Sequence, residues 1–299
     1  LDFMVMGVNY WMKTMPYFSL YDFLICNTQR HYSAFDWHPN VYYVPWGTDV
    51  DIFSPKVKDF KGKVIFFHSS GLAENRKGTD LLLRAFVMLP SNSAELIIHS
   101  QRNLQNYVCS TLGRTKNDLE SLGVKFIEKS VTAPGLYHLG HVYVYPTRLE
   151  GIGLTILEAL SCGLPVIVPD DGPMNEFVSG ERGKLVDIDR RHARADGYYW
   201  PMNVVSVEDL CRKMLYYIEN HHVIPIESEN ARDYAKAELD WSKRYGTVTQ
   251  IFEECYKREM INDASKCREI IEGEKSLLSR AKRFVTEVDS FIRPTIQYY

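Results

Sequence analysis

The 299-residue sequence lacks several features that would assign a protein to a class at once. Its six cysteines form no CxxC pair or other paired spacing, so a disulfide framework is not predicted and reduced thiols in a cytoplasmic protein are expected. No apolar run approaches the roughly 20 residues that span a bilayer. The formal net charge of −3 gives no electrostatic reason to expect nucleic acid or an anionic membrane as a partner.

The sequence does contain alternating strand and helix patterns in its central part. Continuous apolar strands separated by helices predict an α/β fold, a Rossmann-like parallel sheet with helices on both faces. Such sheets bind ligands beyond the carboxyl ends of their strands, so the turns after His68 and Tyr145 are the places to search. The predicted strands are 63–68, 95–99, 124–128, 142–145 and 164–168, and the clearest predicted helix is 79–89.

The flanking parts have different patterns. Short β-type runs at 23–27 and 41–45 enclose a polar, helical piece, and residues 46–55 resemble a linker because glycine, aspartate and proline interrupt them. After the strand at 164–168 the remainder is expected to be helical. A capping box at Ser206–Asp209 begins one of these helices, and the chain is expected to end in a helical C-terminal extension.

The stretch 149–169 carries the strongest chemical signal. A glycine-rich turn with Gly151 and Gly153 precedes a short helix, and the bare amides of a helix N-terminus form a cradle for a diphosphate. Glu150 and Glu158 bracket this turn and can accept hydrogen bonds from sugar hydroxyls. A dinucleotide site is disfavoured because Ile156 replaces the third glycine of GxGxxG. A glycosidase pair is disfavoured because a hydrolase needs no anion cradle. The pattern therefore suggests a nucleotide-sugar site.

A second turn, 69–78, places Arg76 and Lys77 at a helix entrance. Cations there would stabilise the charge that develops on a diphosphate leaving group. Taken alone, however, the turn is better interpreted as a basic surface loop.

Two further groups are weaker candidates. His138 and His141 have HxxH spacing, but no third ligand accompanies them, so a structural role is favoured over metal binding. The aromatic run 198–201, Tyr-Tyr-Trp-Pro, could stack on a sugar, but packing is the favoured interpretation.

Together these segments resemble the family 4 retaining glycosyltransferases of the GT-B fold, in their C-terminal donor-binding domain. Glu150 to Glu158 is similar to the E-x7-E signature of the family, and 75–86 is similar to its basic turn and first helix. Residues 43–53 are similar to the interdomain segment, and 171–176 with 183–186 are similar to the loop and strand that close the site. The resemblance covers about residues 20–245.

The resemblance implies roles for individual residues. Lys77 and Arg76 would bind the donor diphosphate, with Glu150 on the transferred sugar; these three are the catalytic candidates. Glu158 would hold the ribose hydroxyls, and the base would lie around 128–131. The remaining donor-binding candidates, which act mostly through main-chain contacts, are Gly71, Ser130, Val131, Gly151, Ile152, Gly153, Leu154 and Thr155.

The resemblance also implies the domain organisation. Residues 1–55 would be the tail end of an N-terminal acceptor domain with the interdomain linker, 56–245 the Rossmann-like nucleotide-sugar-binding domain, and 246–299 the C-terminal helices. Leu72 stands where many members carry an arginine, and Arg76 is its natural substitute. A histidine that the family usually supplies from the acceptor domain cannot be located here.

The sequence thus predicts a retaining hexosyltransferase that uses a GDP- or UDP-linked sugar and a glycan or other hydroxyl acceptor. No metal or other cofactor is expected, because cationic side chains and a helix N-terminus would stabilise the negative charge of the diphosphate. In addition, no DxD pair follows a strand. No nucleic acid and no transmembrane segment are expected, whereas peripheral membrane contact is compatible with the sequence. A non-catalytic donor-binding module, or an enzyme that hydrolyses or epimerises a nucleotide sugar, are the alternatives.

Overall fold

The structure of the chain is a computed structural model, and it describes residues 18, 21–56, 62–194, 201–257 and 272. Tyr198, Tyr199 and Trp200 of the aromatic run lie outside the described residues. So does most of the predicted 246–299 helical extension.

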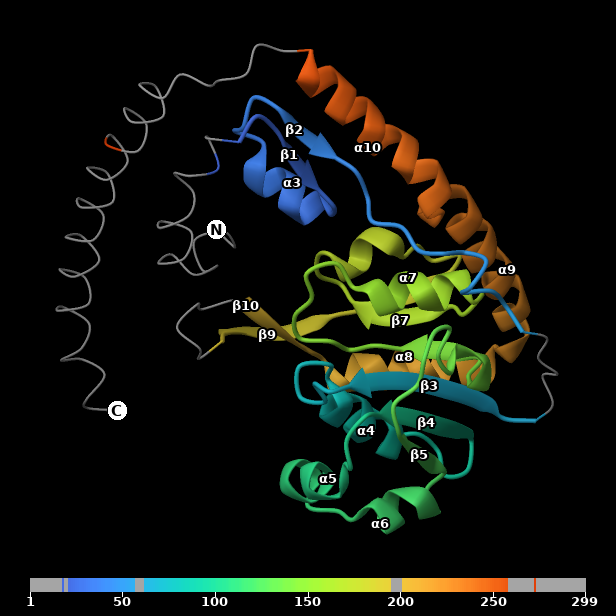
Figure 1. Cartoon of the computed structure of the whole chain (residues 1–299). Helices are drawn as coiled ribbons and strands as arrows, with labels where there is room; N and C mark the ends of the chain where they lie inside the picture. The colour runs from blue at the N-terminus through green and yellow to red at the C-terminus, as the bar shows by residue number, and fades with distance from the viewer. Residues whose placement is uncertain (1–17, 19–20, 57–61, 195–200, 258–271, 273–299) are drawn as a thin grey trace, which may run out of the picture.

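A six-stranded parallel sheet forms the centre of the protein (Figure 1). Its spatial order is β5-β4-β3-β6-β7-β8, so the strand order reverses between β3 and β6. This confirms the predicted α/β fold with a Rossmann-like parallel sheet. The strands are β3 (Val64–Gly71), β4 (Ala94–Ser100), β5 (Val124–Glu128), β6 (Val142–Val144), β7 (Val166–Pro169) and β8 (Gly183–Val186).

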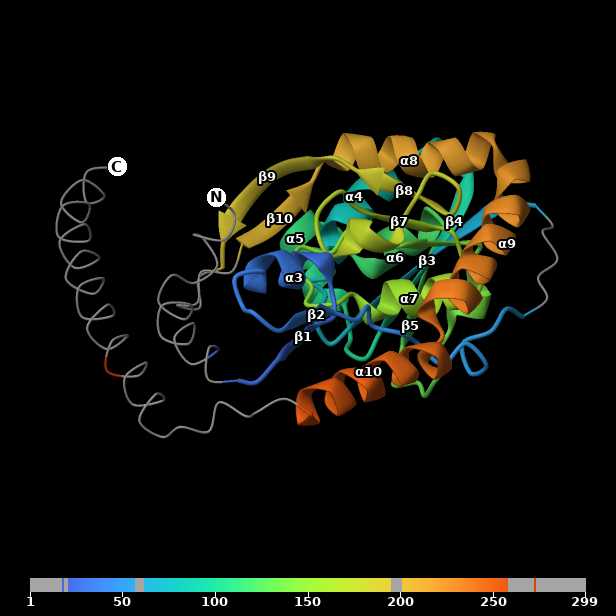
Figure 2. The ribbon, with the colours of Figure 1, turned by 90° about the horizontal axis from the view of Figure 1, so that it is seen from above.

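Helices cover both faces of this sheet (Figures 1 and 2). Phe66 and Phe67 of β3 point to opposite faces of the sheet, and both are almost fully buried. They belong to two different core clusters, one on each face. A strand that is buried on both faces reads as a continuous apolar run, and this is why the pattern was recognisable. One face packs on α4 (Thr79–Val87), α5 (Gln105–Leu112), α6 (Lys116–Ser121) and α8 (Val207–Glu219), and the other on α7 (Leu154–Ser161) and α9 (Ile224–Tyr234).

The prediction that the chain is helical after 164–168 was wrong for 188–193 and 201–205. Beyond β8, which matches the strand expected at 183–186 from the resemblance, the chain forms an antiparallel hairpin of β9 (Ile188–Ala193) and β10 (Pro201–Val205). The hairpin was missed because β9 is exposed and charged, and it therefore lacks the apolar pattern that identifies buried strands. The predicted start of α8 is correct: Ser206 is the N-cap, and its side chain accepts a hydrogen bond from the Asp209 amide.

The strand predicted as 63–68 continues to Gly71, because β3 pairs with β4 as far as Gly71 opposite Ser100. The turn predicted at 69–78 therefore begins only at Leu72. We call residues 72–78 the basic turn.

The N-terminal segment contributes β1 (Leu24–Cys26), α3 (Gln29–Phe35) and β2 (Val41–Tyr43), and its two strands pair in parallel. The amides of Gln29 and Arg30 donate to the Glu176 carboxylate (2.7 and 3.0 Å), which attaches α3 to the loop after β7. The helix α10 (Trp241–Tyr256) returns beside β1 and β2 (Figure 2). The boundary expected between 245 and 246 falls inside this helix.

Candidate functional site

The site lies where the strand order of the sheet reverses. At this point the carboxyl ends of β3 and β6 are neighbours, and their following turns leave a crevice between them. The turn after β3 is the basic turn, and the turn after β6 carries Thr147 to Gly153. The two turns that the sequence singled out are thus brought together by the topology.

A missing side chain allows the two turns to touch. Gly78 has a left-handed backbone (φ +71°), and a Cβ atom built there would lie 2.0 Å from the carbonyl oxygen of Pro146. Only glycine fits a positive φ and so close a backbone approach together. The basic turn therefore lies directly against the chain that leaves β6.

A buried ion pair fixes the same contact. Arg148 donates two hydrogen bonds to the Asp80 carboxylate (2.8 and 2.7 Å), and its guanidinium also donates to the Asn75 carbonyl. The hydroxyl of Tyr107 donates to Asp80 as well (3.1 Å). The backbone amide of Arg148 also donates to the Arg76 carbonyl (2.7 Å). Side chain and backbone of Arg148 together hold the basic turn in place.

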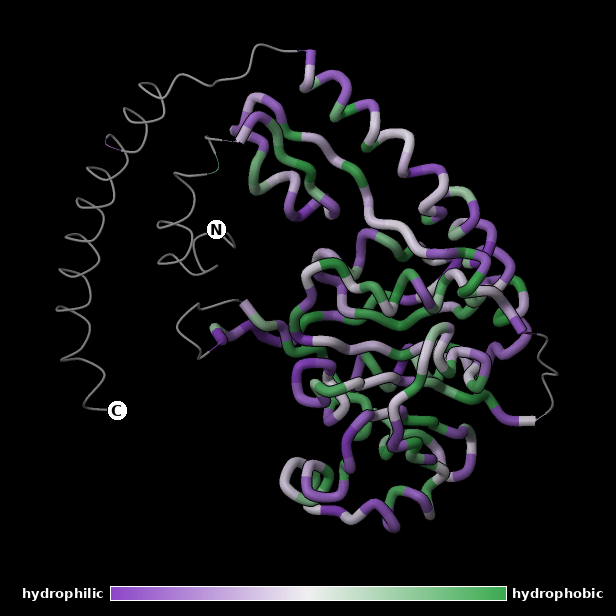
Figure 3. The backbone as a smooth tube through the Cα atoms, in the orientation of Figure 1, coloured by the Kyte–Doolittle hydropathy of each residue, from purple (hydrophilic) through white to green (hydrophobic). Residues whose placement is uncertain are grey.

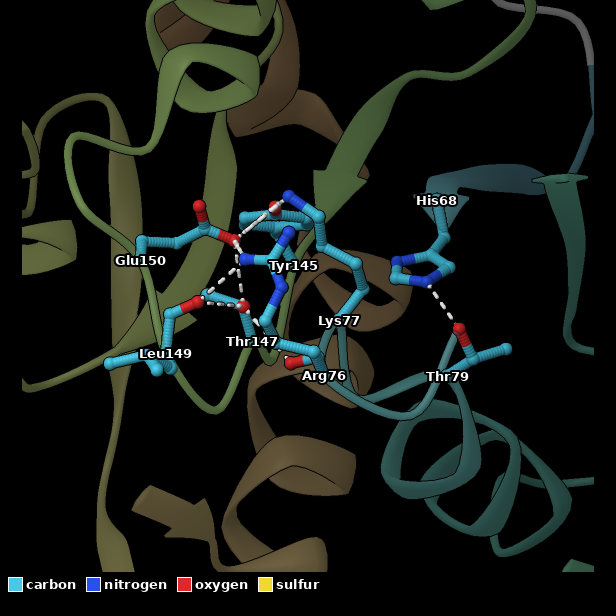
Figure 4. A network of polar contacts seen from close by, with 8 residues as sticks. All are labelled: His68, Arg76, Lys77, Thr79, Tyr145, Thr147, Leu149 and Glu150. Carbon is cyan, nitrogen blue, oxygen red and sulfur yellow. Dashed lines mark hydrogen bonds and ion pairs between the residues drawn. The ribbon is translucent and has the colours of Figure 1, made fainter. Parts of the chain in front are cut away.

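One oxygen of Glu150 is the centre of the polar network (Figure 4). Lys77 Nζ and Arg76 Nη1 each lie 2.8 Å from Glu150 Oε1. The hydroxyls of Tyr145 and Thr147 donate to the same oxygen at 2.6 and 3.0 Å. The ammonium of Lys77 also donates to the Tyr145 hydroxyl. The structure therefore brings the three catalytic candidates Arg76, Lys77 and Glu150 into one cluster.

The charge states of this cluster follow from its surroundings. Burial acts to raise the pKa of Glu150, but Lys77, Tyr145 and Arg76 outweigh it and hold the pKa below its usual value. Burial lowers the pKa of Lys77, and the Glu150 carboxylate opposes that shift. The pKa of Tyr145 is raised well above its usual value by burial and by Glu150, so this phenol remains a neutral donor. Glu150 is accordingly an ionised carboxylate that positions two cations.

A cavity of about 400 Å³ opens beside this cluster. Glu158 lines it, and its Oε2 accepts a hydrogen bond from the Tyr137 hydroxyl (2.5 Å). Burial raises the pKa of Glu158, although Tyr137 and Lys77 act against the shift. Of the residues predicted from the sequence, the cavity is lined by Gly71, Arg76, Lys77, Val131, Thr155 and Glu158.

Glu150 and Gly151 line a different cavity, of about 220 Å³, on the side of the N-terminal segment. The two glutamates thus line separate cavities, and Lys77 lines the cavity of Glu158 while its ammonium contacts Glu150. Four predicted donor-binding residues line neither cavity: Ser130, Ile152, Gly153 and Leu154.

The glycine turn begins a helix as expected. Gly153 is the N-cap of α7 with a left-handed backbone (φ +83°), and no side chain caps this end. The first amides of a helix have no partner within it, so those of residues 154 and 155 are available to an anion.

Sequence reasoning missed Tyr137, Tyr145 and Thr147. Tyr145 and Thr147 stand at the end of a predicted strand, where ligands bind, so their position could have identified them. Tyr137 lies in a 3-10 turn (Tyr137–Leu139) and carried no such signal.

His68 is fully buried to one side of the cluster, between the Val144 carbonyl (2.8 Å) and the Thr79 hydroxyl (2.9 Å) (Figure 4). Burial lowers its pKa to about 4 from an ordinary 6.5, so the folded protein holds a neutral imidazole. The unfolded chain takes up a proton below about pH 6.5, whereas the folded chain does not.

We therefore expect His68 to make the protein less stable in acid. The free energy of unfolding should fall by up to about 3 kcal/mol between the ordinary pKa and the lowered one. His68→Gln should be less stable at neutral pH but should lose less stability on acidification. Urea unfolding of both proteins from pH 7 to pH 4 is the measurement, and parallel pH profiles would contradict the assignment.

His141 has a structural contact: its Nδ1 accepts a hydrogen bond from the Ile65 amide (3.0 Å). Within the described part of the chain, no three histidine, cysteine, aspartate or glutamate side chains are grouped as metal ligands. Of the helices in that part, none combines the length and the apolar character needed to cross a bilayer.

Comparison with known proteins finds similarity to glycosyltransferases. Residues 62–198 match the family described as Glycosyl transferases group 1. A GDP-mannose-dependent monoacylated alpha-(1-6)-phosphatidylinositol monomannoside mannosyltransferase from Corynebacterium glutamicum is 31% identical over an alignment of 186 residues, and the match covers 54% of this chain and 48% of the relative. The lipopolysaccharide core biosynthesis mannosyltransferase LpcC from Rhizobium leguminosarum is 27% identical over an alignment of 188 residues. This match covers 61% of this chain and 49% of the relative.

Among solved structures, sucrose-phosphate synthase from Thermosynechococcus elongatus is similar with a TM-score of 0.66 and 17% identity, covering 84% of this chain and 66% of that one. Fold and site thus define a GT-B-like α/β domain. More narrowly, residues 62–198 of this chain are similar to the glycosyltransferase group 1 family. The chain spans about half the length of the two curated relatives.

Proposed function

We propose that the chain is the donor-binding part of a retaining hexosyltransferase. It would move a hexose from a GDP- or UDP-linked sugar to a glycan or other hydroxyl acceptor. The observation that carries this proposal is the position of Lys77, which lies between the cavity of Glu158 and the carboxylate of Glu150. The name of the Corynebacterium relative favours GDP-mannose as the first donor to test.

The diphosphate would bind at the mouth of the crevice. Lys77 and Arg76 would stabilise the negative charge that develops when the sugar leaves, with the amides of 154 and 155 as further donors. A preorganised cation is effective here because Lys77 is mostly buried, with 14% of its side chain exposed. No step in this scheme requires a metal ion.

The two glutamates would have different roles. Glu158, at the wall of the larger cavity, would accept hydrogen bonds from the ribose hydroxyls. Glu150 already receives four donors on Oε1, so contact with the transferred sugar would fall to its Oε2. We therefore assign Glu150 first to positioning Lys77 and Arg76, and second to orienting the sugar.

Replacing Glu158 by alanine tests this assignment. Affinity for the nucleotide sugar should fall by about 1.5–3 kcal/mol, because charge-assisted hydrogen bonds to the ribose are lost. Calorimetry with GDP-mannose, UDP-glucose and the free nucleotides measures the change. Glu158→Gln is the matched control, since it keeps the size of the side chain. It should lose less affinity for the nucleotide sugar than Glu158→Ala. Unchanged affinity in Glu158→Ala would rule out the ribose role.

A non-catalytic donor-binding module is the second candidate. It is favoured by the position of the candidate donor groups, which all lie within residues 62–198, so this part of the chain could bind a nucleotide sugar without catalysing transfer. Transfer of the hexose by these 299 residues alone would exclude it.

A further inference from the structure

The cavity of about 400 Å³, which we call the nucleotide cavity after its proposed ligand, has a charged end and an uncharged end. Arg76, Lys77 and Glu158 form the charged end, and Figure 3 shows the basic turn in purple, as strongly hydrophilic. The other described residues that line the cavity, towards the ends of β4 and β5, include no aspartate, glutamate, lysine or arginine. A nucleotide would therefore place its phosphates at the charged end and its neutral base at the other.

A chain of hydrogen bonds crosses the uncharged end. Ser69 Oγ lies 2.9 Å from His99 Nδ1, and His99 Nε2 lies 2.8 Å from the carbonyl oxygen of Lys129. Ser69 belongs to β3 and His99 to β4, and Lys129 directly follows β5, so the chain links three strands that are neighbours in the sheet. Only 4% of His99 is exposed, and both of its ring nitrogens are used within the protein.

This chain fixes the direction of the Ser69 hydroxyl. A carbonyl oxygen can only accept, so His99 Nε2 carries a hydrogen. In the neutral imidazole Nδ1 is then an acceptor, and Ser69 donates its one hydroxyl hydrogen to that nitrogen. Ser69 lines the nucleotide cavity and is only partly buried. It therefore presents lone pairs to a ligand and no hydrogen, although a serine elsewhere can both donate and accept.

We propose that Ser69 selects a donor nucleotide with a keto base, by accepting a hydrogen bond from the ring N–H of guanine or uracil. This rests on the proposed transfer function and adds the class of base. Guanine N1 and uracil N3 each carry a hydrogen beside a keto oxygen, whereas adenine N1 and cytosine N3 carry only a lone pair. A lone pair that faces Ser69 Oγ would leave two acceptors without a hydrogen between them, which is unfavourable in a partly buried site.

A second side chain at this end does not have the same selectivity. Gln101 directly follows β4, lines the nucleotide cavity and is exposed. Its amide can donate to the keto oxygen of guanine or uracil, but after rotation it can equally accept from the amino group of adenine or cytosine. Discrimination between the two classes of base therefore depends on Ser69, whose hydrogen is held by His99.

The test is calorimetry of the full chain with GDP, ADP, UDP and CDP. Each keto base is compared with the amino base of the same ring size, so that the size of the cavity does not enter the ratio. We expect GDP to bind at least about tenfold more tightly than ADP, and UDP at least about tenfold more tightly than CDP. GDP methylated at N1 and UDP methylated at N3 lack the hydrogen, and they should bind as weakly as ADP and CDP.

Variants of Ser69 locate the contact. Ser69→Ala should reduce the GDP-to-ADP and UDP-to-CDP affinity ratios by about tenfold, because only the keto nucleotides lose a hydrogen bond. Ser69→Thr keeps the hydroxyl and should keep both preferences. Ser110→Ala is the matched control, because it removes a hydroxyl from an exposed position on α5 that lines neither the nucleotide cavity nor the cavity of Glu150.

The affinity ratio separates base selection from other roles of Ser69. Equal affinity for keto and amino bases in the unaltered protein would overturn the proposal, and so would unchanged ratios in Ser69→Ala. An equal loss of affinity for all four nucleotides in that variant would also overturn it, and would indicate a contact to the ribose or a structural role. Failure of the donor proposal is distinguishable, because then none of the four nucleotides binds and both proposals are refuted.

Discussion

Lys77→Ala is expected to lower kcat/KM for sugar transfer by about 10²- to 10³-fold, or about 3–4 kcal/mol of transition-state stabilisation. In the proposed reaction, the substitution removes the buried cation that would face the developing diphosphate charge, and it takes one of four donors from Glu150. The remaining guanidinium of Arg76 is more exposed and cannot replace it, since solvent screens its charge.

Steady-state transfer assays and calorimetry with GDP or UDP measure this effect. Lys213→Ala is the charge-matched control, because Lys213 lies on α8 and does not line the nucleotide cavity, and its Nζ lies 3.7 Å from Asp209 Oδ1. Equal nucleotide affinity and equal transfer in the Lys77→Ala and Lys213→Ala proteins would remove Lys77 from the donor site.

Arg148→Met is expected to destabilise the fold by about 3–5 kcal/mol, because it leaves the carboxylate of Asp80 buried without its cation. Only 9% of the Arg148 side chain and 12% of the Asp80 side chain are exposed, so solvent cannot compensate. The free energy of unfolding in urea measures the loss.

A double-mutant cycle separates the charge from the packing. In Arg148→Met with Asp80→Leu both charges are absent, and much of the stability should return. Nucleotide affinity should nevertheless stay low, because Asn75 and the basic turn are no longer held by the guanidinium. If the double variant were as unstable as the single one, the ion pair would not be the cause.

The parts of the fold that follow from burial could be predicted from the sequence. The parallel strands β3, β4, β6 and β7 are apolar on both faces, and a continuous apolar run bounded by turns identifies such strands. The β9–β10 hairpin could not be found in this way. Its outer strand is exposed, and its pairing with β10 is set by tertiary contacts to Asp171 and Arg148 that local pattern does not encode.

The site was predictable in its chemistry but not in its arrangement. The residues themselves indicated Glu150 at the glycine turn, whereas Arg76 and Lys77 were selected through the family resemblance, and the strand order brings the three together. The sequence did not predict that Glu150 and Glu158 line separate cavities. This outcome depends on the direction in which the Glu150 side chain extends from the turn and the Glu158 side chain from α7.

The partner of Glu158 was unpredictable for a similar reason. Tyr137 is 21 residues away in sequence and approaches only through the 3-10 turn before β6. Spacing along the chain can indicate which groups carry chemistry, whereas their mutual distances are decided by the whole fold.

The close contact between Gly78 and Pro146 restricts the substitutions that position 78 tolerates. A methyl group at that position would push the segment after β3 away from the one after β6, and the reach from ammonium to carboxylate would lengthen with it. The distance between the Lys77 ammonium and the Glu150 carboxylate therefore depends on the absence of a Cβ atom at Gly78. Salt and acid weaken electrostatic attractions, but neither changes the steric requirement for glycine where residue 78 contacts Pro146.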